Sequence, residues 1–270
     1  MDSTLILSTA AVFLMVLCLL FAGFLWAVNS KNKLSNRILA GMLIVLAISI
    51  SAFWYGFYFE VHLGLDRIRD DINILVSPLL FLFICSALHS NFKLRWIHVL
   101  HLLPFIVITL VLVPNFNFAS SELKLAFRGN YFEQTEVKIT NVIRFVTTVG
   151  YYTWSYVVLY QAKLLILANH SDDKIRLYNW LWQLNTISVA IFLVSLTKGF
   201  LRFQVSAEAF QFVRLGMVLT LISFLIWMVM KALHHPLLFR GLDGSLLSVS
   251  QILERHKENN GSEALDEDEI

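Results

Sequence analysis

The stretch at residues 4–28, TLILSTAAVFLMVLCLLFAGFLWAV, contains no charged residue and is apolar over nearly its whole length. A helix needs about 20 apolar residues to cross the hydrocarbon core of a bilayer, which is about 30 Å thick. The stretch is therefore predicted to span a membrane. The residues before it, Met-Asp-Ser, lack the basic charge of a signal peptide, and the apolar run is longer than a signal peptide's, so we expect the helix to be retained.

Six further apolar stretches follow along the chain, at residues 35–59, 72–88, 96–113, 139–167, 178–200 and 210–233. Hydrophobic residues make up 57% of the 270 residues and charged residues 15%, and the mean hydropathy is +0.68. A water-soluble protein needs more polar surface than this composition supplies. The sequence predicts an all-α fold, a seven-helix transmembrane bundle in residues 1–233, with helix kinks at Pro78 and Pro104.

Basic residues near the helix ends predict the orientation of the bundle, since Lys and Arg are enriched on the cytoplasmic side of membrane proteins. The amino-terminus has none, whereas the first connection carries Lys31, Lys33 and Arg37. We therefore expect the amino-terminus outside and, after seven crossings, the carboxyl-terminus in the cytoplasm. The predicted location is the plasma (inner) membrane, with multiple passes and contact with membrane lipids.

Two regions are expected outside the bilayer. The connection at residues 114–138 is rich in aromatic residues and is expected to lie over the outer end of the bundle as a cap or interfacial element. The segment 234–258 is predicted to form a cytoplasmic juxtamembrane amphipathic helix, on the apolar spacing of residues 246–253. The polar, acidic residues 259–270 are typical of a disordered tail.

Four short runs carry a resemblance to a known family. NRILAGML at residues 36–43, VSPLLFLF at 76–83, HVLHLLPF at 98–105 and ALHHPLLF at 232–239 occur in this order and spacing. Together they resemble the seven-helix N-terminal membrane domain of membrane-bound AraC-type transcriptional regulators. The resemblance covers roughly residues 1–245. It implies a bacterial inner-membrane sensor that acts on transcription.

The same family continues into a cytoplasmic helix-turn-helix pair, and here the chain departs from it. No basic recognition helix follows residue 245, and the acidic tail would be repelled by DNA phosphates. We therefore expect no direct nucleic acid binding by this chain. Either it is a fragment of a longer regulator, or it is a freestanding membrane domain that signals through a cytoplasmic output protein or as a homodimer.

Charged residues inside membrane helices are costly and often functional. Arg144, Lys198, Arg202 and Arg214 are expected at one level near the outer ends of three consecutive helices, and Lys198 and Arg202 are spaced so that their charges repel. Two interpretations stay open. The four cations form a pocket for an anionic ligand, or they anchor at lipid headgroups or pair with nearby carboxylates, for which the candidates are Glu60, Asp66, Asp70 and Asp71.

Polar residues deeper in the bundle form a second candidate site. Tyr151, Tyr152 and Asn185 are candidates to line a ligand cleft, although hydrogen bonding between packed helices is the favoured explanation of such groups. The histidines lack a nearby carboxylate or cysteine that would complete a metal site, and Cys18 and Cys85 lie within apolar stretches. We expect no metal, no cofactor and, because no catalytic motif is recognisable, no enzymatic activity.

Two function classes follow from this pattern. The first is a membrane sensor that passes a ligand or envelope signal to a cytoplasmic output. The second is a small-molecule or lipid transporter or permease-like protein. Transporters commonly show internal repeats and broken helices with charges at mid-membrane. Neither a repeat nor a deep charge is recognisable in this sequence, which favours the sensor.

Overall fold

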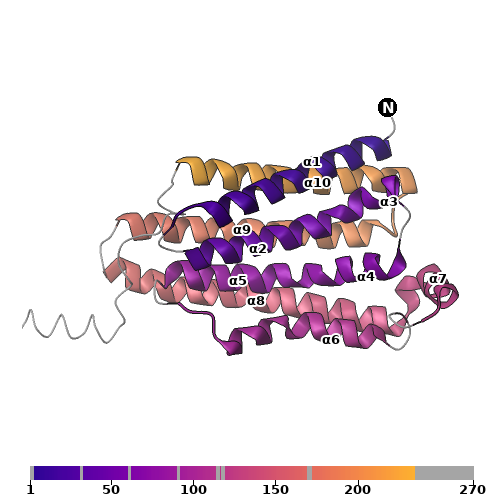
Figure 1. Ribbon diagram of the computed structural model, residues 1–270, viewed down its shortest axis with the longest axis horizontal. Coiled ribbons are helices and arrows are strands. Elements are labelled where there is room, and N and C mark those ends of the chain that lie inside the picture. The colour runs from indigo at the N-terminus through magenta and orange to yellow at the C-terminus, as the bar shows by residue number, and fades with distance from the viewer. Residues whose placement is uncertain are drawn as a thin grey trace, which may run out of the picture.

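The computed structural model describes residues 3–30, 33–59, 62–89, 92–113, 116, 119–168 and 172–234. These residues are almost entirely helical and include no strand (Figure 1). Along the chain, the longer α-helices are α1 (Ser3–Ala27), α2 (Lys33–Ile50), α4 (Leu63–Ile72), α5 (Val76–Leu88), α6 (Leu103–Leu112), α8 (Thr135–Ala168), α9 (Asp172–Leu201) and α10 (Ala207–His234). Shorter helical pieces are η1 (Ser51–Phe53), α3 (Tyr55–Tyr58), η2 (Asn73–Leu75), η3 (Trp96–Leu102), α7 (Ser121–Gly129) and η5 (Tyr131–Glu133).

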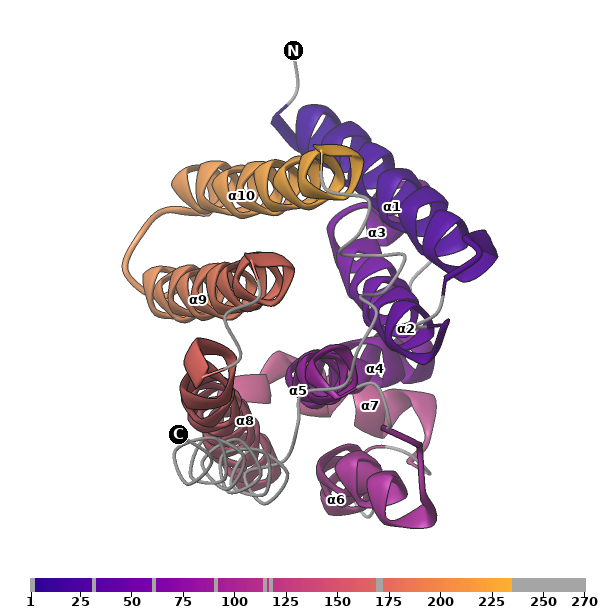
Figure 2. The same ribbon diagram turned by 90° about the vertical axis from the view of Figure 1, so that its left-hand side faces the viewer.

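The long helices run side by side along the longest axis of the molecule. Viewed from one end, α1, α2 and α5 lie opposite α8, α9 and α10, and α6 lies outside against α8 (Figure 2). Contacts between α1 and α10 and between α5 and α8 join the two halves. We call the end that holds α3, α4 and α7 the α7 end, and the end at which α1 ends and α2 begins the far end (Figure 1).

Five helical stretches in the described residues are long and apolar enough to cross a membrane: Ser3–Ala27, Lys33–Phe53, Leu63–Leu88, Lys174–Leu201 and Ala207–His234. A shorter apolar stretch covers Trp96–Leu112. The longest helix, α8, has 34 residues and would extend about 50 Å at the usual helical rise. It lies outside the five because polar and aromatic residues interrupt its apolar character. These helices are compatible with a multi-pass membrane protein.

Leucine side chains from α1, α2, α5, α8, α9 and α10 meet in one apolar core. Leu14, Leu39, Leu80, Leu159 and Leu181 are each completely buried there. The outward faces are apolar as well, because Leu20 on α1, Phe200 on α9 and Leu233 on α10 are exposed. A helix that is apolar on all sides is typical of a membrane span or of a large protein's core. In a bundle of this size, the outer apolar faces fit contact with lipid.

The third expected segment begins earlier than the sequence indicated. Residues 63–71, LGLDRIRDD, were expected to form a loop before a helix at 72, but they form α4 and continue through η2 into α5. Their charges suit a helix because side chains of α4 and α8 neutralise them. The helix that was expected to begin at residue 139 likewise begins at Thr135.

Both prolines lie where a 3₁₀ segment passes into an α-helix. Pro78 is the third residue of α5, after η2, and Pro104 is the second residue of α6, after η3. Proline is tolerated in the first turn because the amide hydrogen that it lacks has no partner within the helix there. The prolines therefore fall where regular hydrogen bonding already changes.

The connection between α6 and α8 is folded against the α7 end. Phe116, Phe127, Leu112 and Val137 form a small buried cluster, with Tyr131 partly buried beside it. Ser120 caps α7 by accepting a hydrogen bond from the Leu123 amide. The expected cap element is thus present in the described part of this connection. The predicted juxtamembrane helix and acidic tail beyond His234 lie outside the described residues.

Candidate functional site

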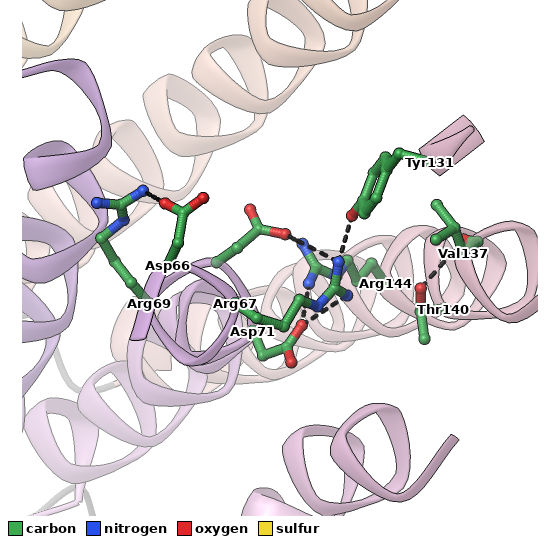
Figure 3. Close-up of polar contacts among 9 residues, drawn as sticks. Asp66, Arg67, Arg69, Asp71, Tyr131, Val137, Thr140 and Arg144 are labelled. Atoms are coloured by element: carbon green, nitrogen blue, oxygen red, sulfur yellow. Dashed lines mark hydrogen bonds and ion pairs between the residues drawn. The ribbon is translucent and has the colours of Figure 1, made fainter. Parts of the chain in front are cut away.

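The most concentrated polar cluster joins α4, α8 and η5 at the α7 end (Figure 3). Arg67 of α4 is its central residue, with only 5% of its side chain exposed. Its Nη1 donates a hydrogen bond to the Tyr131 hydroxyl. Its Nη2 lies 2.8 Å from Oδ1 of Asp71, one turn further along the same helix. Arg67 therefore connects a residue of the α6–α8 connection to a buried carboxylate.

Asp71 is shared between two arginines. The same Oδ1 accepts a hydrogen bond from Nη2 of Arg144 on α8 at 2.5 Å, and only 2% of the Asp71 side chain is exposed. Nη1 of Arg144 lies 3.0 Å from Oδ2 of Asp70, which is half exposed. Asp70 is also 3.7 Å from Arg67. Two arginines and two aspartates thus balance in charge.

Burial makes this balance important, because an unpaired charge in a poorly hydrated site costs several kcal/mol. The phenol of Tyr131 completes the cluster by accepting from Arg67. Burial raises the pKa of Tyr131 above its ordinary value, against the opposing pull of Arg67. The phenol therefore keeps its proton at physiological pH and serves as a neutral acceptor.

Asp66 and Arg69 form a separate ion pair on another side of α4 (Figure 3). The Arg69 guanidinium also lies over the ring of Tyr55, 5.9 Å from its centre. Glu60, the remaining candidate countercharge, lies outside the described residues.

Lys198 of α9 and Arg214 of α10 meet at one aromatic ring. The Lys198 Nζ lies 5.6 Å and the Arg214 Cζ 5.3 Å from the centre of Phe53, which ends η1. Arg214 also donates to Oε1 of Gln211 at 3.2 Å and to the carbonyl of Ala52 at 3.5 Å. Both side chains are partly buried. The shared ring consequently places the Lys198 Nζ and the Arg214 Cζ within about 11 Å of each other.

Arg202 follows directly after α9 and stacks on the α6–α8 connection. Its Cζ lies 4.7 Å from the ring centre of Phe132 in η5. Phe132 in turn makes an edge-on contact with Phe203. Arg202 is close enough to both Lys198 and Arg214 to repel them electrostatically. The structure therefore gathers these three cations, while Arg144 pairs with the carboxylates of α4.

Comparison of the chain with protein-family models, curated proteins and solved structures gave no match.

The second candidate site lies further along α8 and α9. Asn185 is completely buried, and its Nδ2 donates to the carbonyl of Tyr152 at 3.4 Å, while its Oδ1 has no partner in the described part of the molecule. Tyr152 is also buried. Tyr151 points elsewhere, with its hydroxyl 2.7 Å from Nδ1 of His101. The three residues therefore do not share one set of contacts.

We call the charged residues at the α7 end, together with the side chains they contact, the polar layer; its charged members are Arg67, Asp70, Asp71, Arg144, Lys198, Arg202 and Arg214. Several of its residues were not among the site residues predicted from the sequence. In the sequence, Arg67 lies between the expected helices, Phe53 lies within the apolar stretch at 35–59, and Tyr131 and Phe132 lie in the aromatic-rich connection at 114–138. The alternation of Arg and Asp at residues 66–71 was the available signal, because its spacing puts Arg67 and Asp71 one helical turn apart. Tyr131, the hydrogen-bond partner of Arg67, is 64 positions away along the chain, and a local sequence pattern cannot predict a contact over that separation. Among the residues described, no group of His, Cys, Asp and Glu is arranged to hold a metal.

Proposed function

We propose that this chain is a membrane sensor domain that detects a ligand or envelope state at the α7 end and passes the signal to a cytoplasmic output. One observation carries this proposal. Arg67 is nearly inaccessible to solvent, yet it donates a hydrogen bond to Tyr131 in the α6–α8 connection and forms an ion pair with Asp71, which also accepts from Arg144. A surface element is thereby tied to two long helices.

Such a cluster suits a switch because its parts depend on one another. If η5 moves, Arg67 loses the Tyr131 hydroxyl while the Arg67–Asp71–Arg144 contacts must carry the remaining charge. The free energy of the arrangement in which α4 packs against α8 then changes. A ligand that prefers one arrangement can shift the population between the two.

The proposed topology has seven crossings, with the α7 end outside and the far end in the cytoplasm. The basic residues Lys33 and Arg37 lie in the first turns of α2, at the far end, as expected for a cytoplasmic side. On the resemblance to membrane-bound AraC-type regulators, we propose that the output is control of transcription, through a partner or a further domain.

Gene deletion with complementation tests this function. In the source organism, deletion is expected to change a discrete set of transcripts. Wild-type protein and Tyr160→Phe should restore them, because Tyr160 is 60% exposed. Tyr131→Phe, which makes the same chemical change within the polar cluster, should not. Unchanged transcripts after deletion, with the protein verifiably present in the parent, would count against a sensor of transcription.

One observation favours the transporter alternative. Three of the apolar stretches contain 3₁₀ segments, η1, η2 and η3, and broken helices are common in transporters. Two results would support transport over sensing. Deletion of the gene would abolish uptake of a solute or lipid by cells, and purified wild-type protein in proteoliposomes would transport the same compound.

A further inference from the structure

We propose that Lys198, Arg202 and Arg214 form a binding site for a phosphate-bearing anion at the α7 end. This inference rests on the proposed function, because it names the class of ligand that the sensor would detect.

The charge distribution at the α7 end is the first argument. Arg67 and Arg144 are matched by Asp70 and Asp71. Lys198, Arg202 and Arg214, by contrast, make no ion pair with a carboxylate in the described part of the chain. Asp70 attracts Lys198 at longer range, but it is already engaged by two arginines. The polar layer as described therefore carries an excess of positive charge on the side of α9 and α10.

The arrangement of the three cations is the second argument. Lys198 and Arg214 approach the same ring, Phe53, from two different helices, and Arg202 adds a third charge from the end of α9. Contact with an aromatic face is favourable but leaves the charge in place. The cations consequently repel one another, and an anion seated between them would remove that repulsion.

The donor set favours phosphate over a simple carboxylate. Two guanidinium groups and one ammonium offer more N–H donors than the two oxygens of a carboxylate can accept. A phosphate group has at least two free oxygens, and a monoester carries nearly two negative charges at neutral pH. Arginine forks pair well with phosphate oxygens, and lysine acts as an additional point charge.

The surrounding surface suits a phosphate group on an amphiphile. Phe200, Phe203 and Phe212 lie next to the three cations in sequence, and each is more than 60% exposed. An anionic lipid could place its headgroup on the cations and its acyl chains along these aromatics. Free phosphate offers the same headgroup chemistry without the apolar contact, so the two sources can be separated experimentally.

Binding measurements on the full chain in neutral detergent test the site. Dioleoylphosphatidic acid, dioleoylphosphatidylcholine and inorganic phosphate serve as probes, with native mass spectrometry for the lipids and calorimetry for phosphate. Lys198→Gln and Arg214→Gln should each weaken binding by about tenfold, the effect of losing one charged hydrogen bond. Lys124→Gln is the matched control. The Nζ of Lys124, on α7, lies 5.9 Å from the centre of the Phe116 ring, in a similar cation–aromatic contact.

A thermal measurement guards against variants that merely misfold. Without added phosphate, Lys198→Gln should leave the melting temperature unchanged or raise it, because one repulsive charge is gone. With dioleoylphosphatidic acid or phosphate, the wild-type protein should gain stability and Arg214→Gln should not. Binding of phosphatidic acid alone, or of inorganic phosphate as well, supports the site and identifies its source.

The proposal is overturned if wild-type protein binds neither phosphatidic acid nor phosphate better than Arg214→Gln does. It is also overturned if Lys124→Gln weakens binding as much as Lys198→Gln. These outcomes concern binding only. Failure of the sensor function would appear separately, as phosphate binding without any effect of the gene on transcripts.

Discussion

At the scale of single residues, Asp71 is expected to contribute strongly to stability. It is almost fully buried and neutralises Arg67 and Arg144 together. Removing the charge of one partner from a buried ion pair leaves the others unbalanced, which typically costs about 3–5 kcal/mol. Asp71→Asn is therefore expected to lower the stability of the protein by an amount in this range, as measured by thermal or denaturant unfolding in detergent.

Asp66→Asn provides the control for this prediction. Asp66 pairs with Arg69 on the same helix, but its side chain is 29% exposed, and exposed pairs contribute about 1 kcal/mol or less. Equal losses for the two variants would mean that the buried cluster has no special role in stability.

Asn185 leads to the opposite expectation. Its Oδ1 is buried without a partner in the described residues, and such a group costs about 1–3 kcal/mol. Asn185→Leu, which is close in size, should leave the stability of the ligand-free protein unchanged or increase it. A loss of more than about 1 kcal/mol would show that the amide makes a stabilising interaction. Unfolding measured alongside Asp71→Asn compares the two sites directly.

At the scale of elements, the α6–α8 connection is expected to be held by Tyr131. Tyr131→Phe removes the acceptor of Arg67 without changing the ring contacts to Phe127 and Phe132. Amide hydrogen exchange in residues 121–133 should become faster, because local opening costs less free energy. Exchange in α1 should not change, and Tyr160→Phe should leave both regions as they are. Identical exchange of residues 121–133 in both variants would contradict the proposed tie.

The elements also show how far the sequence could be interpreted. Apolar runs located the cores of the long helices, because a bilayer imposes their length. Residues 63–71 were misassigned, since their charges resemble a loop until Arg144, a partner 73 positions away from Asp71, is known. The level of Lys198, Arg202 and Arg214 was predicted by counting along the helices. That Arg144 separates from them could not be predicted, because it depends on how α4 and α8 pack.

At the scale of the whole molecule, the polar layer at the α7 end is expected to face outside. Phe203 at this end and Leu233 at the far end are 62% and 68% exposed. In a variant whose Cys18 and Cys85 are replaced by alanine, Phe203→Cys should react with a membrane-impermeant maleimide in intact cells or spheroplasts. Leu233→Cys should react only after lysis. The reverse pattern would place the proposed phosphate site in the cytoplasm.

Transmission between the two ends of the bundle can be measured by the distance between spin labels at the far end. Trp26→Cys on α1 and Leu233→Cys on α10 give exposed positions on two helices in contact. Double electron–electron resonance in nanodiscs would compare phosphatidylcholine with added phosphatidic acid. We predict that phosphatidic acid shifts the distance distribution in the otherwise wild-type protein and not in Arg214→Gln. Superimposable distributions, with phosphatidic acid shown to be bound, would contradict the passage of a signal from the α7 end to the far end.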